Sequence, residues 1–147
     1  MADRPDSLLA AAAQVAANAY APYSKFAAGA AVEARDGSVF VGTNMENASY
    51  GLSICAEVGA MQAAVAAGKH SQIVRMAVVG GLIEVGLRNG EVVTPCGRCR
   101  QIIFEASVLS GTDIEVWCGN IDLKNVHLYK ISELLPHAFG PADLVAD

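Results

Sequence analysis

Two short segments place the strongest constraint on how this chain folds: Cys-Ala-Glu at 55–57 and Pro-Cys-Gly-Arg-Cys at 95–99. Cys96 and Cys99 are three residues apart, so the first turn of a helix presents their sulfur atoms on one face, as a pair of metal ligands requires. Cys55 offers a third thiol. Soft sulfur ligands and tetrahedral coordination together favour zinc. The fold must therefore bring two distant segments together around one metal ion.

The spacing of Cys55 and Glu57 sets a second condition. Residues two apart in a regular helix point in nearly opposite directions, so Cys55 must sit at the cap of the helix that contains Glu57. A thiolate at a helix N-terminus is stabilised by the helix dipole and by free backbone N–H groups. We therefore expect two helix N-termini to meet, one at Cys55 and one at Cys96.

Three protein ligands leave the fourth position of zinc to water, which is the arrangement of catalytic zinc sites. Such a site lowers the pKa of its water towards neutrality. Glu57 is then placed to accept a proton, pass it to a ring nitrogen of a bound base and protonate the departing amine. The combination of Cys-Ala-Glu with Pro-Cys-x-x-Cys is the three-cysteine form of the zinc deaminase signature. The pattern predicts hydrolytic release of ammonia, with Glu57 as the catalytic residue.

Three other interpretations of the cysteines remain open. A structural zinc site needs a fourth ligand, for which Cys118 is the spare cysteine, although a core position suits Cys118 better. A redox-active pair at 96–99 would leave Cys55 and Glu57 unexplained. Unrelated buried thiols would make the combined motif a coincidence, and we consider this the weakest interpretation.

Composition indicates one acidic domain that forms oligomers. The 147 residues suffice for a single domain, 1–147, with one hydrophobic core. The apolar fraction of 53% is high and rich in alanine, which predicts closely approaching helices or buried subunit faces. The net charge is -5, and no run of Lys or Arg follows the pattern of a phosphate-binding surface. We expect a homo-oligomer and no nucleic-acid partner.

The N-terminal segment 1–21 resembles an export signal only superficially. Two aspartates offset the positive charge of Arg4, and Gln14 and Asn18 interrupt the apolar run. The apolar spacing fits one stripe of an amphipathic helix. No segment reaches the roughly twenty apolar residues that span a bilayer. We therefore expect a cytoplasmic protein without a membrane partner, whose cysteines are thiols or metal ligands rather than disulfides.

Hydrophobic patterns predict an α/β fold in which helices pack on the faces of a five-stranded sheet. An Asp-Gly turn at 36–37 predicts a hairpin between the first two strands. The expected strands lie at 28–34, 39–44, 73–80, 114–118 and 126–129. The expected helices lie at 7–20, 54–67 and 96–109, with a final turn at 131–135.

Further segments make the chain similar to the cytidine deaminase family, in particular its short bacterial class that forms homotetramers. These segments cover most of the chain and lie at 21–26, 29–31, 44–51, 55–57, 95–101, 134–136, 139–141 and 143–144. The resemblance implies a cytidine deaminase-like, three-layer α-β-α fold with a five-stranded mixed sheet. It also implies that Cys55, Cys96 and Cys99 hold one zinc ion per subunit and that Glu57 transfers the proton.

The resemblance implies roles for four substrate-binding residues. Phe26 would stack on the pyrimidine, and the backbone of Ala56 would bond its polar edge. Asn44 and Glu46 would hold the ribose 3′-hydroxyl. Without the resemblance, Phe26 would be interpreted as a core aromatic, and Asn44 and Glu46 as a turn at a strand end.

A second set of residues is implied to enter the site of a neighbouring subunit. This set contains Ala48, Ser49, Tyr50 and Phe139. Such an exchange between subunits would explain the apolar excess. Taken alone, Phe139 would be a C-terminal anchor.

One position departs from the family pattern. Most members have Arg directly after the catalytic Glu, where it offsets the charge of three thiolates, and this chain has Val58 there. Arg98 stands instead between the paired cysteines, as in blasticidin S deaminases and some actinobacterial cytidine deaminases. We expect Arg98 to supply the missing cation. The alternative is a solvated surface arginine, as we expect Arg100 to be.

The predicted function is zinc-dependent hydrolytic deamination of cytidine and deoxycytidine to uridine and deoxyuridine in pyrimidine salvage. The alternative is a deaminase of another aminated nucleoside or base, such as blasticidin S, because Val58, Gly59 and the segment 95–99 resemble that branch. Asn44 and Glu46 favour a nucleoside. A non-catalytic, zinc-stabilised binding module is a third hypothesis, which Glu57 beside an open coordination position argues against.

Overall fold

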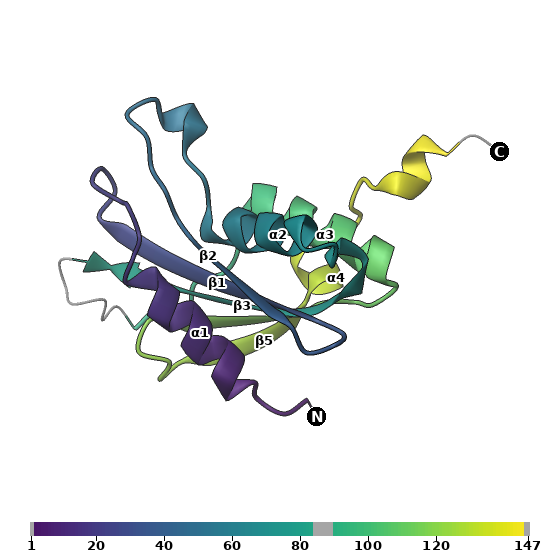
Figure 1. Ribbon diagram of the computed structural model, residues 1–147, viewed down its shortest axis with the longest axis horizontal. Helices are drawn as coiled ribbons and strands as arrows, with labels where there is room; N and C mark the ends of the chain where they lie inside the picture. Colours follow the sequence, from purple (N-terminus) through teal and green to yellow (C-terminus); the bar gives the residue numbers. More distant parts are fainter. Residues whose placement is uncertain (1, 84–89, 146–147) are drawn as a thin grey trace.

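A five-stranded mixed sheet forms the middle layer of the protein (Figure 1). The computed structural model describes residues 2–83 and 90–145. The strands are β1 (Phe26–Ala34), β2 (Val39–Thr43), β3 (Ile73–Leu82), β4 (Glu115–Asn120) and β5 (Val126–Lys130). Their order is β2-β1-β3-β4-β5, with β3 and β4 parallel and the other neighbours antiparallel. The expected hairpin and the five-stranded sheet are confirmed.

Helices cover both faces of this sheet, which confirms the three-layer α-β-α architecture (Figure 1). The helix α1 (Asp6–Ala16) packs on one face, and α2 (Ala56–Ala66), α3 (Gly97–Ser110) and the short α4 (Ile131–Leu134) pack on the other. Three single turns of 3-10 helix, η1 (Tyr50–Leu52), η2 (His70–Gln72) and η4 (Pro141–Leu144), lie between or after them. None of the helices in the described part of the chain has the length and hydropathy to cross a bilayer.

Each face of the sheet has its own apolar core. The α1 side is built around Leu8, Leu9 and Trp117, with alanine and valine from β1 and β3. The core on the opposite side is larger and contains the inner faces of α2 and α3 together with Cys118 of β4. Alternate residues of β3, such as Val78 and Val79, contribute to opposite cores, because successive side chains of a strand point to opposite faces.

Most strand and helix boundaries differ from the expected ones by one or two residues, and at two helix ends the reason is a backbone hydrogen bond to another segment. The first helix ends at Ala16 rather than at residue 20, because Tyr20 pairs with the chain after β2: its N–H donates to Asn44 O at 3.0 Å. The second helix begins at Ala56 rather than at residue 54, because Ile54 exchanges two backbone hydrogen bonds with Met45. The chain therefore stays extended up to the site residue Cys55.

Small residues let the helices approach the sheet closely, as the alanine content predicts. A β carbon at Gly42 of β2 would lie 2.3 Å from the backbone nitrogen of Ala60 in α2. A β carbon at Gly29 of β1 would lie 1.9 Å from the carbonyl oxygen of Ala12 in α1. Only glycine fits at such distances. Gly42 thereby sets the depth at which α2, and the site at its N-terminus, lies on the sheet.

Candidate metal centre and active site

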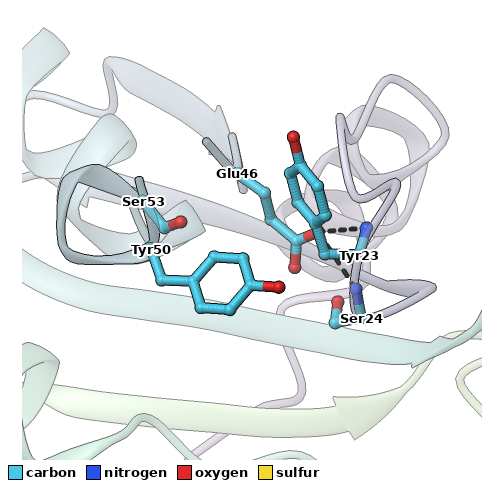
Figure 2. A pocket seen from close by; sticks show the side chains of 5 residues that line it. All are labelled: Tyr23, Ser24, Glu46, Tyr50 and Ser53. Atoms are coloured by element: carbon cyan, nitrogen blue, oxygen red, sulfur yellow. Dashed lines mark hydrogen bonds between the residues drawn. The ribbon is translucent and has the colours of Figure 1, made fainter. Parts of the chain in front are cut away.

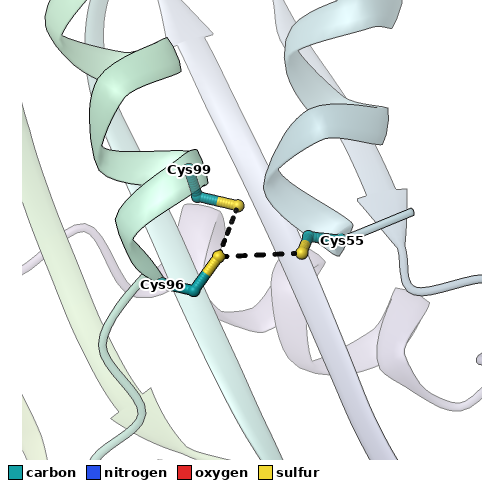
Figure 3. Close-up of side chains that lie close together, drawn as sticks. All are labelled: Cys55, Cys96 and Cys99. Atoms are coloured by element: carbon teal, nitrogen blue, oxygen red, sulfur yellow. Dashed lines mark hydrogen bonds between the residues drawn. The ribbon is translucent and has the colours of Figure 1, made fainter. Parts of the chain in front are cut away.

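Three thiols from two helix N-termini meet at one point (Figure 3). Cys55 is the N-cap of α2 and Cys96 is the N-cap of α3, while Cys99 lies in the first turn of α3. The Sγ atoms of Cys55 and Cys96 are 3.9 Å apart, and those of Cys96 and Cys99 are 3.6 Å apart. The structure thus confirms the two conditions drawn from spacing: the helix starts meet, and Cys55 precedes helical geometry.

The spacing of the three sulfur atoms fits zinc. Thiolates at about 2.3 Å from a tetrahedral zinc ion lie about 3.8 Å from one another. The observed separations of 3.6 and 3.9 Å bracket this value. Cys55, Cys96 and Cys99 are thus the residues that would hold the metal, with one coordination position left over.

Cys118 takes no part in this cluster. Its side chain is fully buried in the core beneath α2 and α3, and its Sγ contacts the carbonyl oxygen of Val116 at 3.8 Å. Burial raises the pKa of this thiol to about 12. The expectation that Cys118 packs in the core is confirmed, so the alternative of a closed site with Cys118 as fourth ligand has no support in the geometry.

Glu57 lies in the first turn of α2 and points to the thiols. Its Oε2 accepts a hydrogen bond from the Cys99 thiol at 3.3 Å, and only 6% of the residue is exposed. Burial raises the pKa of the Glu57 carboxyl, because the charged form loses its hydration. A redox-active pair at 96–99 would not explain why Glu57 and Cys55 lie beside Cys96 and Cys99. The arrangement is that of a buried proton carrier beside a metal site.

The thiols compete for negative charge. The pKa of Cys55 is lowered to about 6, chiefly by the neighbouring Cys99 thiol, and the positive charge of Arg98 acts in the same direction. The pKa of Cys99 is raised, first by its interaction with Cys55 and then by burial. Thiols this close lose all their protons only when a cation offsets the charge.

A cavity of about 200 Å³ opens beside Glu57 and two of the thiols. Its lining brings together most of the residues expected to contact substrate. The lining residues are Phe26, Ala28, Asn44, Cys55, Ala56, Glu57, Val93, Thr94 and Cys96. Three of them, Ala28, Val93 and Thr94, escaped the sequence analysis. The position of Thr94 directly before the Pro-Cys-x-x-Cys motif was the signal that could have identified it.

The side chain of Asn44 bridges the backbone of β1. Its Nδ2 donates to the carbonyl oxygen of Phe26 at 2.8 Å, and its Oδ1 accepts from the N–H of Ala28 at 2.9 Å. Asn44 therefore fixes the start of the strand that carries Phe26, in addition to lining the cavity.

Glu46 lies in a second cavity, of about 360 Å³, that Tyr23, Ser24, Tyr50 and Ser53 also line (Figure 2). Its Oε1 accepts hydrogen bonds from the backbone N–H groups of Tyr23 at 3.0 Å and Ser24 at 3.1 Å. Contacts with Ser24 are the main cause that lowers the pKa of Glu46. Asn44, two residues earlier in the chain, lines the cavity beside Glu57, and the shared ribose contact of Asn44 and Glu46 stays a prediction.

Comparison with known proteins identifies the family. Residues 3–110 match the family model of the cytidine and deoxycytidylate deaminase zinc-binding region. The chain belongs to this deaminase family. The match includes the helix starts that carry Cys55, Cys96 and Cys99, so the thiol cluster lies within the matched zinc-binding region.

Relatives of this deaminase extend over nearly the whole chain. A cytidine deaminase of Halalkalibacterium halodurans is 41% identical over 137 residues, which cover 93% of this chain and 95% of the relative. A cytidine deaminase of Mycobacterium tuberculosis is 41% identical over 133 residues, covering 90% of this chain and 87% of the relative. The crystal structure of cytidine deaminase from Burkholderia pseudomallei superposes with a TM-score of 0.80 at 40% identity, covering 93% of this chain and all of that chain.

Four residues that the deaminase resemblance assigns to a neighbouring site are exposed in the single chain. Ala48 and Ser49 directly precede η1, which begins at Tyr50, and Tyr50 is 73% exposed. Phe139 is 61% exposed, and its carbonyl oxygen accepts a hydrogen bond from Gln101 Nε2 at 2.7 Å. In the view of Figure 1 both segments project beyond the three layers. None of these residues lines the cavity beside Glu57 in its own chain.

The two arginines of α3 differ from each other. Arg98 is exposed, and its charge acts on the thiolate of Cys55. Arg100, which we expected to be a solvated surface residue, is partly buried and donates three side-chain hydrogen bonds. That expectation is wrong, because the position of Arg100 on α3 faces the preceding loop and α4 rather than solvent.

Proposed function

We propose that this deaminase converts cytidine and deoxycytidine to uridine and deoxyuridine with release of ammonia, in pyrimidine salvage. One observation carries the proposal: a buried carboxylate, Glu57, lies 3.3 Å from a thiol of a zinc-spaced cysteine cluster, beside a cavity of about 200 Å³. The cytidine deaminases that resemble this chain over most of its length support the substrate class.

The chain's own groups supply the proton transfer. Zinc, when bound by the three cysteines, supplies a water with a lowered pKa. Glu57 would take a first proton from this water and deliver it to the adjacent ring nitrogen, while the hydroxide adds to the amino-bearing carbon. Glu57 would then take the remaining proton of that added hydroxyl and pass it to the departing amine. A carbon–oxygen bond forms, the carbon–nitrogen bond breaks, and the net reaction consumes one water and releases ammonia. Burial of Glu57 keeps bulk water from competing for the proton.

Substrate binding follows from the lining of the two cavities. Phe26 offers a ring face for the pyrimidine, and the Ala56 backbone borders its polar edge. Asn44 retains one N–H and one lone pair for a ribose hydroxyl, after its two bonds to β1. Glu46 uses Oε1 for backbone bonds and offers Oε2 to the ribose from the second cavity.

The active form is a homo-oligomer, in our proposal a homotetramer with one zinc ion per subunit. Exposed Tyr50 and Phe139 support it, because large aromatic side chains on projecting segments favour burial against a second copy. Ala48 and Ser49 would accompany Tyr50 into the neighbouring site. Nucleic acid is not among the proposed partners, since the chain carries a net charge of -5.

The proposal places all 147 residues in one deaminase domain, because helices from both halves of the chain pack on the same sheet. It also places the protein in the cytoplasm. The free thiols of the zinc cluster support this location, since a reducing compartment keeps metal-binding cysteines from forming disulfides.

A second candidate substrate is another aminated base, such as blasticidin S. The observation that favours it is the exposed Arg98 between the paired cysteines, combined with Val58 after Glu57. A non-catalytic zinc module is opposed by the buried carboxylate, because burying Glu57 next to thiols is costly without a function.

An ammonia-release screen tests the function. Zinc-loaded protein is assayed with cytidine, deoxycytidine, adenosine, guanosine and blasticidin S. We expect ammonia from the first two at rates well above those for the purines. Release from blasticidin S alone would replace the proposed substrate by the second candidate. No release from any compound by a protein that holds stoichiometric zinc would favour the non-catalytic module.

A further inference from the structure

We propose that Arg100 is a positioning residue, which fixes the loop before Cys96 so that this ligand meets the other two thiols. Its Nε donates to the carbonyl oxygen of Pro95 at 2.7 Å, and its Nη1 donates to the carbonyl oxygen of Leu134 at 3.0 Å. Its Nη2 donates to Thr94 Oγ1 at 3.2 Å. The inference rests on the proposed zinc site and goes beyond it, because it names a residue that touches neither metal nor substrate.

The loop before Cys96 needs such support. The segment 90–96 leads into α3 without helix or strand geometry. Asn125 Nδ2 holds the start of this segment by donating to Gly90 O at 2.8 Å, but closer to Cys96 the bond from the N–H of Val93 to Gly119 O is long, at 3.4 Å. Pro95 has no N–H to donate. Cys96 is exposed and caps α3 without a side-chain hydrogen bond to the backbone. The position of the Cys96 sulfur therefore depends on what holds residues 94 and 95.

Arg100 contacts three consecutive residues of this loop. The guanidinium bonds Thr94 and Pro95, and the backbone N–H of Arg100 donates to Cys96 O at 2.9 Å as the helix begins. Its third side-chain bond, to Leu134 at the end of α4, anchors the same planar group to a separate element. A guanidinium presents its donors in a rigid fork, so three acceptors fix its orientation and it fixes theirs.

The consequence is specific to the site. Thr94 lines the cavity beside Glu57, and Cys96 is a zinc ligand, so displacement of this loop moves a wall of the cavity and one ligand together. Loss of groups that orient metal ligands typically weakens metal affinity about 10- to 100-fold.

The chain contains a matched control. Arg35 donates from Nη2 to the carbonyl oxygen of Ser110 at 2.9 Å and to Thr112 Oγ1 at 3.2 Å. These acceptors lie at the C-terminal end of α3, opposite the zinc ligands. Arg35 and Arg100 thus tie opposite ends of one helix through the same chemistry, a backbone carbonyl and a threonine hydroxyl.

The experiment compares zinc-loaded wild type, Arg100→Met, Arg100→Lys and Arg35→Met. Zinc release to the chelator 4-(2-pyridylazo)resorcinol, kcat and KM for cytidine, and Tm are measured for each. We expect Arg100→Met to release zinc about 10- to 100-fold faster and to lower kcat. Arg35→Met should lower Tm while its zinc release stays close to wild type. The rate of zinc release from Arg100→Lys should lie between the rates of wild type and Arg100→Met, because lysine restores a hydrogen-bond donor.

Equal zinc release from Arg100→Met and wild type would overturn the proposal, as would equal acceleration in Arg35→Met. If Arg100→Met does not fold, Thr94→Val takes its place, since it keeps the arginine and removes one acceptor. Faster zinc release from Thr94→Val than from wild type supports the proposal. Unchanged zinc release overturns it. Zinc release requires no substrate. Wild-type protein that holds zinc but deaminates neither nucleoside would therefore contradict the proposed function while the Arg100 comparison still gives its own answer.

Discussion

The thiol of Cys99 donates a hydrogen bond to Oε2 of Glu57 across 3.3 Å, joining the first turn of α3 to the first turn of α2. The two residues are 42 positions apart in the chain, and both are buried. The contact places the proposed proton carrier against the proposed metal ligands. It also links the N-termini of α2 and α3, so a displacement of either helix changes the distance between Glu57 and the thiols.

Replacement of Glu57 by glutamine separates catalysis from metal binding. Glutamine keeps the shape of the side chain and cannot carry the proton, so we expect kcat for cytidine to fall by about 10²- to 10⁴-fold. Zinc content, measured by atomic emission, should stay at the wild-type level. Glu91→Gln is the control, because Glu91 is exposed. A kcat for Glu57→Gln that equals that of Glu91→Gln would contradict the role of Glu57.

Single cysteine substitutions test the ligand set. Cys55→Ala, Cys96→Ala and Cys99→Ala should each lose most of the bound zinc, because two thiolates hold the ion far less firmly than three. Cys118→Ala should keep its zinc and lose about 1 kcal/mol of stability, since its sulfur fills space in the core. Metal analysis and denaturant unfolding check both outcomes. Loss of zinc from Cys118→Ala alone would point to a different ligand set.

Substitution of Arg98 tests the charge compensation for Val58. Arg98→Ala removes a cation that stabilises the thiolate of Cys55, so zinc affinity should fall about 10- to 100-fold. Arg98→Lys keeps the charge and should retain most of the affinity. Competition with a zinc chelator measures both. If metal content and turnover of Arg98→Ala match wild type, Arg98 is an ordinary surface arginine.

A methyl group at Gly42 should push α2 away from the sheet. Its β carbon would lie 2.3 Å from the backbone nitrogen of Ala60, so we expect Gly42→Ala to cost about 1–3 kcal/mol of stability. Gly59→Ala is the matched control on the facing helix. Its β carbon would lie 3.4 Å from the Cα of Gly42, which is ordinary contact, so it should be neutral or stabilising. Urea unfolding of the two variants decides, and equal stability would refute the close-approach argument.

The turn at Asp36 should stabilise the fold in a pH-dependent way. Asp36 pairs with Lys69 Nζ at 2.8 Å and accepts a hydrogen bond from the Ser38 N–H, and the pair with Lys69 is the main cause that lowers its pKa. A lowered carboxyl pKa contributes stability above the unfolded-state value of about 3.9 and loses it as the pH falls below that value.

We therefore expect Asp36→Asn to be less stable than wild type at pH 7 and to approach wild type at pH 3. Denaturant midpoints of both proteins at pH 7, 4 and 3 measure the difference. A gap between the two proteins that widens on acidification would show that the charge of Asp36 does not contribute.

The elements with strong local signals were predictable. The Asp-Gly turn at 36–37 and the apolar run that forms β3 depend on residues close in the chain, and the hairpin and the start of β3 lie where expected. The end of α1 was not predictable to the residue, because it depends on backbone hydrogen bonds that join Tyr20 to the distant Asn44 and Glu46. Local helix propensity contains no information about hydrogen-bond partners that are distant in the sequence and become neighbours only in the folded chain.

The sequence by itself predicted the meeting of three cysteines, the carboxylate beside them and the order of helices and strands. Cysteine spacing and the helical period fix which side chains of 55–57 and 96–99 share a face, whatever surrounds them. Only the tertiary structure decided that the guanidinium of Arg100 bonds Pro95 and Leu134, that Asn44 bridges β1, and that Glu46 bonds the backbone of Tyr23 and Ser24. These roles depend on hydrogen bonds between segments far apart in the chain, and the direction of such bonds follows from how the layers pack.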